Sequence, residues 1–174
     1  MKHLRKILLF LPIIFVTLVY WSVYTFDYQV SKVVRFNDTS DATVSKVFDL
    51  SSYYAPAEKV FVKYYQSRNI NEHDCNLLSK YSEKLLKSNS RSSQAYFVKA
   101  VCDEKIGNLK GALGNAYLAL KYDKYNTTYL LTIAILQLNS GNLIEAEKFV
   151  NLIEEIDANT KNLDLVKNAL QANK

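Results

Sequence analysis

Two consecutive stretches of 34 residues, 93–126 and 127–160, align with each other without a gap. The alignment pairs Gly107 with Gly141 and Asn108 with Asn142. Such a period means that one supersecondary unit occurs twice and buries its apolar face against its neighbour. The repeat therefore restricts the chain to a stacked architecture, and the helical spacing of its apolar residues predicts an all-α fold.

Each stretch has the residues that two antiparallel helices need where they cross. Small side chains allow close approach, and they occur as Ala100 and Ala134 in the first helix of each stretch. The second helix has Ala112 or Ala146 at the corresponding contact. The glycine between the two helices supplies the positive φ that ends the first one.

This pattern resembles the tetratricopeptide repeat. The resemblance implies an α-solenoid of antiparallel helix pairs that binds protein, and it covers the two stretches well. The chain departs from the family at Ile153, where a last alanine is usual, and at Lys124 and Ala158, where proline often follows the second helix. The exit turns are therefore expected to be atypical.

The remaining chain divides around these repeats. We expect a repeat domain over 56–174, in which 56–92 is a degenerate repeat without the turn glycine and 161–174 is a capping helix. A linker over 27–55 precedes it and contains a short amphipathic helix at 41–50. The capping helix is expected to face inward with Leu163, Val166 and Leu170.

Residues 7–24 contain no charge, and their 18 residues span roughly 27 Å as a helix, against about 30 Å for a bilayer core. Tyr20, Trp21 and Tyr24 lie at one end, as in an interfacial belt. The stretch predicts an uncleaved transmembrane signal-anchor. A cleaved signal peptide and a buried helix of a soluble core are the alternatives, but no A-x-A-like cleavage site follows the run.

Three basic residues among the first six positions predict a cytoplasmic N-terminus, although Lys32 and Arg35 on the far side weaken the bias. The sequence thus predicts a single-pass protein whose residues 1–26 form the basic flank and the anchor. Residues 7–26 would contact the lipid bilayer. Abundant Lys, Asn, Tyr and Ile suggest an AT-rich bacterial genome. The expected location is a bacterial inner membrane, with the repeat domain in the periplasm.

The net charge of +5 comes largely from that N-terminal flank, since residues 27–174 carry 19 basic and 17 acidic side chains. Without a basic stripe interleaved with stacking aromatic residues, the sequence argues against nucleic-acid binding.

In the resembled family the first helix of each repeat lines a concave groove. Its ligand-facing positions correspond here to Phe97, Val101, Glu104, Lys105, Thr128, Leu131, Ile135, Leu138 and Asn139. Because the central ones are apolar, the resemblance implies an apolar groove rather than a clamp for a terminal carboxylate. Either a helical segment of a partner or the chain's own 41–50 segment would fill it.

Cys75 and Cys102 fall at helix ends that antiparallel packing brings together, so the sequence allows either a disulfide or two buried free thiols. His73 precedes Asp74 and Cys75, but adjacent residues at a helix start point in different directions, and Asp74 is expected to be the helix cap. No phosphate loop, dinucleotide fingerprint or zinc spacing occurs. We therefore expect no enzyme activity, no cofactor, no metal and no small-molecule substrate.

The sequence predicts a membrane-anchored scaffold or adaptor that docks another envelope or membrane protein through the apolar groove. The alternative is an accessory structural subunit of a larger membrane enzyme, transport or secretion complex, with the transmembrane helix as part of the interface.

Overall fold

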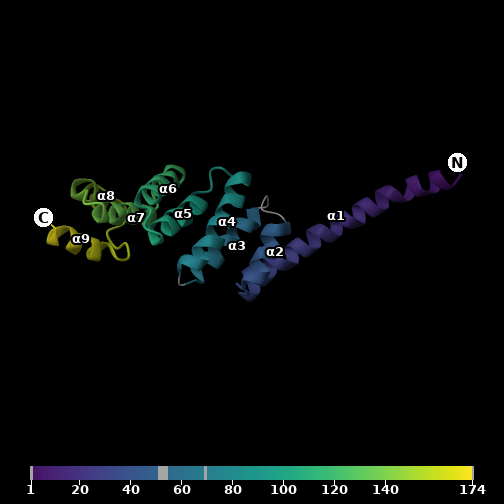
Figure 1. Cartoon of the computed structure of the whole chain (residues 1–174), viewed down its shortest axis with the longest axis horizontal. Helices are drawn as coiled ribbons and strands as arrows, with labels where there is room; N and C mark the ends of the chain where they lie inside the picture. The colour runs from purple at the N-terminus through teal and green to yellow at the C-terminus, as the bar shows by residue number, and fades with distance from the viewer. Residues whose placement is uncertain (1, 51–54, 69, 174) are drawn as a thin grey trace. The chain divides into compact units, whose positions relative to one another are not determined.

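The computed structural model describes residues 2–50, 55–68 and 70–173, giving only the backbone for 2–11, 55 and 56. Over these ranges every regular element is an α-helix, which confirms the all-α class (Figure 1). The described helices are α1 (Lys2–Phe36), α2 (Asp41–Leu50), α3 (Ala55–Gln66), α4 (Glu72–Ser88), α5 (Ser93–Lys105), α6 (Leu109–Tyr122), α7 (Thr127–Asn139), α8 (Leu143–Asp157) and α9 (Leu163–Ala172). They form two compact units, Met1–Ser67 and Arg68–Lys174.

The first unit is built from α1, α2 and α3, which contact one another. Val44 and Val47 on α2 and Val60 on α3 have no exposed surface, and Val33 brings the end of α1 into the same unit. The ring of Phe48 meets the ring of Phe61 edge-on at 6.3 Å. The apolar face expected for residues 41–50 is therefore buried within this unit.

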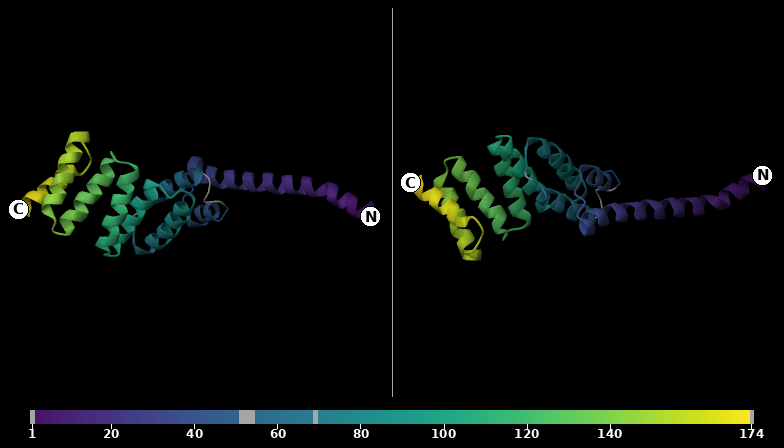
Figure 2. Two further views of the ribbon diagram at one scale, coloured as in Figure 1. Left: turned by 90° about the horizontal axis from the view of Figure 1, so that it is seen from above. Right: turned by 90° about the horizontal axis from the view of Figure 1, so that it is seen from below.

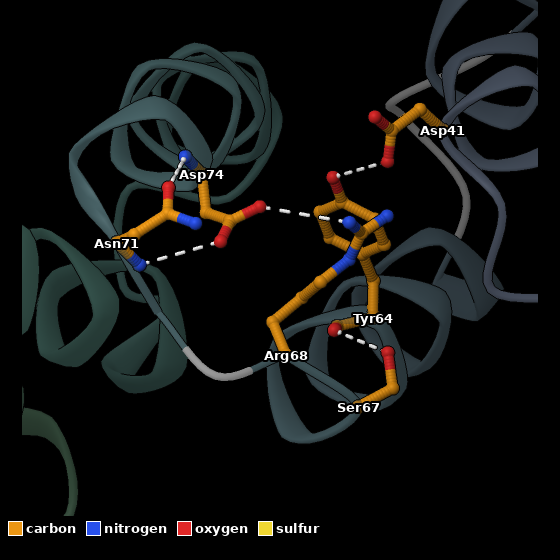
Figure 3. A network of polar contacts seen from close by, with 6 residues as sticks. All are labelled: Asp41, Tyr64, Ser67, Arg68, Asn71 and Asp74. Atoms are coloured by element: carbon orange, nitrogen blue, oxygen red, sulfur yellow. Dashed lines mark hydrogen bonds and ion pairs between the residues drawn. The ribbon is translucent and has the colours of Figure 1, made fainter.

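Polar contacts fix the helix ends of the first unit. Lys63 Nζ donates to the carbonyl oxygen of Val34 at 2.9 Å, and the Tyr64 hydroxyl donates to Asp41 at 2.8 Å (Figure 3). Asp38 accepts hydrogen bonds from Ser40 and Thr43 ahead of α2. These hydrogen bonds to the carboxylate lower the pKa of Asp38 below its usual value.

The structure corrects the membrane prediction. Among helices of the described residues, none combines the length and the apolar character needed to cross a bilayer. The predicted location in a bacterial inner membrane, with a periplasmic repeat domain, is contradicted by this finding.

The second unit is a succession of antiparallel helices, in which each helix from α4 to α9 packs against the next (Figures 1 and 2). One apolar cluster of this unit contains alanines of both repeats, and Ala100, Ala112, Ala116, Ala134 and Ala146 have no exposed surface. A methyl group at each crossing lets the helix axes approach closely, so that the larger Leu130, Ile133 and Ile153 fill the space between layers.

The two turns between first and second helices share a pair of hydrogen bonds, although Asn108 also accepts a cap bond from the Gly111 N–H and Asn142 makes no side-chain cap bond. Asn108 Nδ2 donates to Asp103 at 3.0 Å, and Asn142 Nδ2 donates to Gln137 at 2.9 Å. The second pair follows the first at an offset of 34 residues. In each pair the backbone N–H of the asparagine also donates to the backbone carbonyl oxygen of its partner. Asp103 and Gln137 thus provide the same acceptor with different side chains.

The helix starts repeat in the same way. Ser92 accepts a hydrogen bond from the Ala95 backbone N–H at 3.2 Å at the start of α5. At the start of α7, Asn126 accepts one from the Tyr129 N–H at 3.3 Å. Each cap satisfies a backbone donor that has no partner inside the helix.

The turn glycines provide a direct test of this geometry. Gly107 and Gly141 adopt φ values of +78° and +76°, with no atom within 4 Å of an added Cβ. Gly107→Ala and Gly141→Ala should each lower the free energy of unfolding by about 1–2 kcal/mol, because alanine is strained in the left-handed region. Gly114 lies inside α6 with equal space around it and without a positive φ, so Gly114→Ala should raise that free energy by up to about 1 kcal/mol. Urea denaturation measures the free energy of unfolding of the three variants. Equal changes at all three positions would contradict a requirement for positive φ at the two turns.

Candidate protein-binding surface

The positions that the resemblance assigned to a groove lie on α5 and α7, the first helices of the two repeats. The central residues Phe97 and Leu131 are 7% and 8% exposed. The Phe97 ring lies 4.8 Å from the ring of Tyr129, which joins α5 to α7. Leu131 belongs to the main apolar cluster of the unit. These two residues therefore hold neighbouring repeats together and offer little surface to a ligand.

The accessible part of this surface is less apolar than the sequence suggested. Val101, Glu104, Ile135 and Leu138 are half-buried. The exposed positions are all polar, namely Lys105, Thr128 and Asn139. Moreover, α7 contains no charged residue along its whole length, so its accessible side consists of hydroxyl, amide and aliphatic groups.

Two residues of this region were missed by sequence reasoning. Tyr129 covers Phe97, as described above. On α9, which contacts both α7 and α8, Leu165 is 67% exposed. Leu165 follows Leu131 by 34 residues, as Leu131 follows Phe97, so extending the period by one step would have found it.

A second surface feature lies on α8, outside the positions predicted from the sequence. Ile144, Glu147, Lys148, Phe149, Asn151, Leu152 and Glu155 line an open hollow of about 490 Å³. Ile144 is 84% exposed at its edge. The hollow lies on the second helix of a repeat, whereas the predicted surface lies on the first helices. Substitutions can therefore test the two surfaces independently.

The start of α4 has a structural role that accounts for its polar residues. Asn71 is the N-cap and accepts a hydrogen bond from the Asp74 N–H at 3.0 Å, while the Asp74 carboxylate accepts one from the Asn71 N–H (Figure 3). Arg68 lies 3.6 Å from Asp74. The N-cap is thus Asn71, three residues before the position assigned from sequence.

The chemistry-bearing side chains nearby differ in their exposure. His73 is exposed, whereas Cys75 and Cys102 are buried free thiols. Burial, reinforced by the neighbouring Cys75, raises the pKa of the Cys102 thiol. Within the described residues no group of His, Cys, Asp and Glu side chains has an arrangement that could hold a metal ion.

No known protein-family model matches the chain, and no curated protein matches its sequence. Solved structures do match. The type III secretion chaperone SycD of Yersinia enterocolitica, in complex with a peptide of the translocator YopD, superposes with a TM-score of 0.54 at 19% identity, covering 78% of this chain and 95% of SycD. A second SycD structure gives a TM-score of 0.55 at 19% identity, with coverages of 81% and 90%.

TTC0263, a thermophilic TPR protein of Thermus thermophilus, superposes with a TM-score of 0.59 at 15% identity, covering 82% of this chain and 78% of TTC0263. At these identities the likenesses establish the fold alone. The chain therefore has the TPR-like helical fold that its period predicted. Its structural neighbours are a secretion chaperone and a TPR protein, neither of which is described as an enzyme.

The capping box of α4 predicts a measurable loss of stability. Asn71→Ala removes the acceptor for the Asp74 N–H and should lower the free energy of unfolding by about 1 kcal/mol. Asn76→Ala, an exposed change in the same helix, should stay within about 0.5 kcal/mol of the parent. Chemical denaturation followed by circular dichroism measures both, and a neutral Asn71→Ala would mean that the box does not stabilise α4.

Proposed function

We propose that this chain is a protein-interaction scaffold that binds a segment of another polypeptide along α5 and α7. The observation that carries the proposal is the pairing of these two first helices through Phe97 and Tyr129. It is accompanied by half-buried apolar side chains on both helices, Val101 on α5 and Ile135 and Leu138 on α7. A preformed surface of this kind binds a partner without first having to order itself.

The structural comparison supports a peptide as the ligand. SycD, which shares the fold, was solved with a peptide of its translocator partner YopD. We extend only this mode of recognition to the present chain, since the identity of 19% carries no information about the partner's sequence.

The charges on the surface indicate the chemistry of the bound segment. Because α7 has no charged residue, a ligand charge placed over this helix would lose hydration without gaining an ionic partner. The one charged pair among the predicted positions, Glu104 and Lys105, lies at the end of α5. We therefore propose that the bound segment presents aliphatic or aromatic side chains to α7 and places its polar ends beyond it.

Peptides selected from a random display library on the immobilised full chain provide the test. Selected sequences should be rich in apolar residues, and p-benzoylphenylalanine introduced in place of Thr128 should cross-link them. The double variant Thr128→Arg, Asn139→Arg places two charges at exposed positions of α7 and should weaken binding at least tenfold, or about 1.4 kcal/mol. Phe97 and Leu131 are unsuitable for this purpose because their burial makes them part of the core.

The matched control changes the hollow on α8. Ile144→Asp also introduces charge at an exposed position and should leave the affinity unchanged. If the α7 double variant still binds the peptides and Ile144→Asp does not, the peptides bind at the hollow on α8 rather than on α7. A library that yields no enriched sequence would contradict peptide binding altogether.

A further inference from the structure

The chain has two cysteines, and both are in the second unit. Cys75 is 4% exposed and Cys102 is 3% exposed, and neither is part of the proposed peptide-binding surface. Cys75 lies near the start of α4, and Cys102 lies near the end of α5.

Helix packing places the two thiols together. The helices α4 and α5 are joined by the short segment 89–92, run antiparallel and pack against each other (Figure 2). The start of α4 is therefore beside the end of α5. Cys75 and Ser79, which are one helical turn apart on α4, both influence the pKa of the Cys102 thiol, as expected if they lie beside it.

The surroundings of Cys102 disfavour its thiolate. Desolvation and the adjacent Cys75 raise the pKa of Cys102, so that little thiolate forms there at neutral pH. Since the thiolate is the attacking species, a single buried thiol of this kind reacts slowly with external reagents. Once one thiol has formed a mixed disulfide, a second thiol held beside it by the fold reacts with it far more readily than a thiol in solution would.

We propose that Cys75 and Cys102 are a redox-sensitive pair that forms a disulfide between α4 and α5 when a disulfide oxidant such as oxidised glutathione is supplied. One thiol loses its proton and its sulfur attacks the oxidant, whose S–S bond breaks to release one reduced glutathione. The second protein thiol then loses its proton and attacks the mixed disulfide. A second glutathione leaves, so two protein thiols are oxidised while one glutathione disulfide is reduced.

The bond would act at the N-terminal end of the second unit. It closes a loop of 28 residues and ties the start of α4, which is also held by its capping box and by Arg68, to the first complete repeat. By restricting the unfolded chain, the crosslink is expected to raise the thermal midpoint by about 10 °C. Reduction of the disulfide would restore the less stable dithiol form.

Oxidation of the folded full chain tests the pair. The reduced protein is incubated with oxidised glutathione under native conditions and its intact mass is measured, followed by a non-reducing tryptic map. We expect loss of two hydrogen atoms, a linked pair of peptides containing Cys75 and Cys102, no retained glutathione, and a higher thermal midpoint that dithiothreitol reverses.

The variants Cys75→Ala and Cys102→Ala each remove one sulfur and provide the controls. Neither should form an internal crosslink or show the oxidation-dependent shift, even if each has a lower midpoint when reduced. A parent chain that retains both thiols, accumulates only glutathione adducts or forms only intermolecular dimers overturns the proposal. Crosslinking that occurs only in denaturant overturns it equally, because the native contact would then play no part.

Discussion

The close approach of helices at buried alanines is the constraint on which the second unit depends. Ala100, Ala112 and Ala134 have no exposed surface, and each lies where a larger side chain would push two helix axes apart. That approach allows Leu130 and Ile133 to pack between the layers. The separate packing of α4 against α5 brings the start of α4, with Cys75, beside the end of α5, with Cys102.

At one point of each turn the repeat preserves a hydrogen bond although the residue that accepts it differs. Asn108 and Asn142 are identical at the 34-residue offset, but their side-chain acceptors are Asp103 and Gln137. The alignment could not reveal this equivalence, because it compares residue types. Asp and Gln are different types, although a carboxylate and an amide both offer an acceptor oxygen. Conversely, the matching glycines could be interpreted directly, since both turns require a positive φ.

The candidate surface was harder to predict than the fold. The period correctly places Phe97 and Leu131 at equivalent positions, but it does not show whether those positions face a ligand or the neighbouring repeat. Their burial shows that they mainly face neighbouring side chains. Exposure depends on how far one helix covers the next, a quantity that sequence spacing does not contain. The membrane span predicted from residues 7–24 was wrong, since no helix among the described residues has the length and apolar character to cross a bilayer.

The sequence by itself determined the all-α class, the TPR-like fold and the positive-φ turns, because these depend on local spacing and on residues with special backbone freedom. The tertiary structure alone decided that the apolar face of α2 is buried in the first unit, that Tyr129 covers Phe97, and that Leu165 remains exposed. These outcomes depend on distances between helices that are remote in sequence. Such distances follow from the packing of whole side chains rather than from the order of residues along one helix.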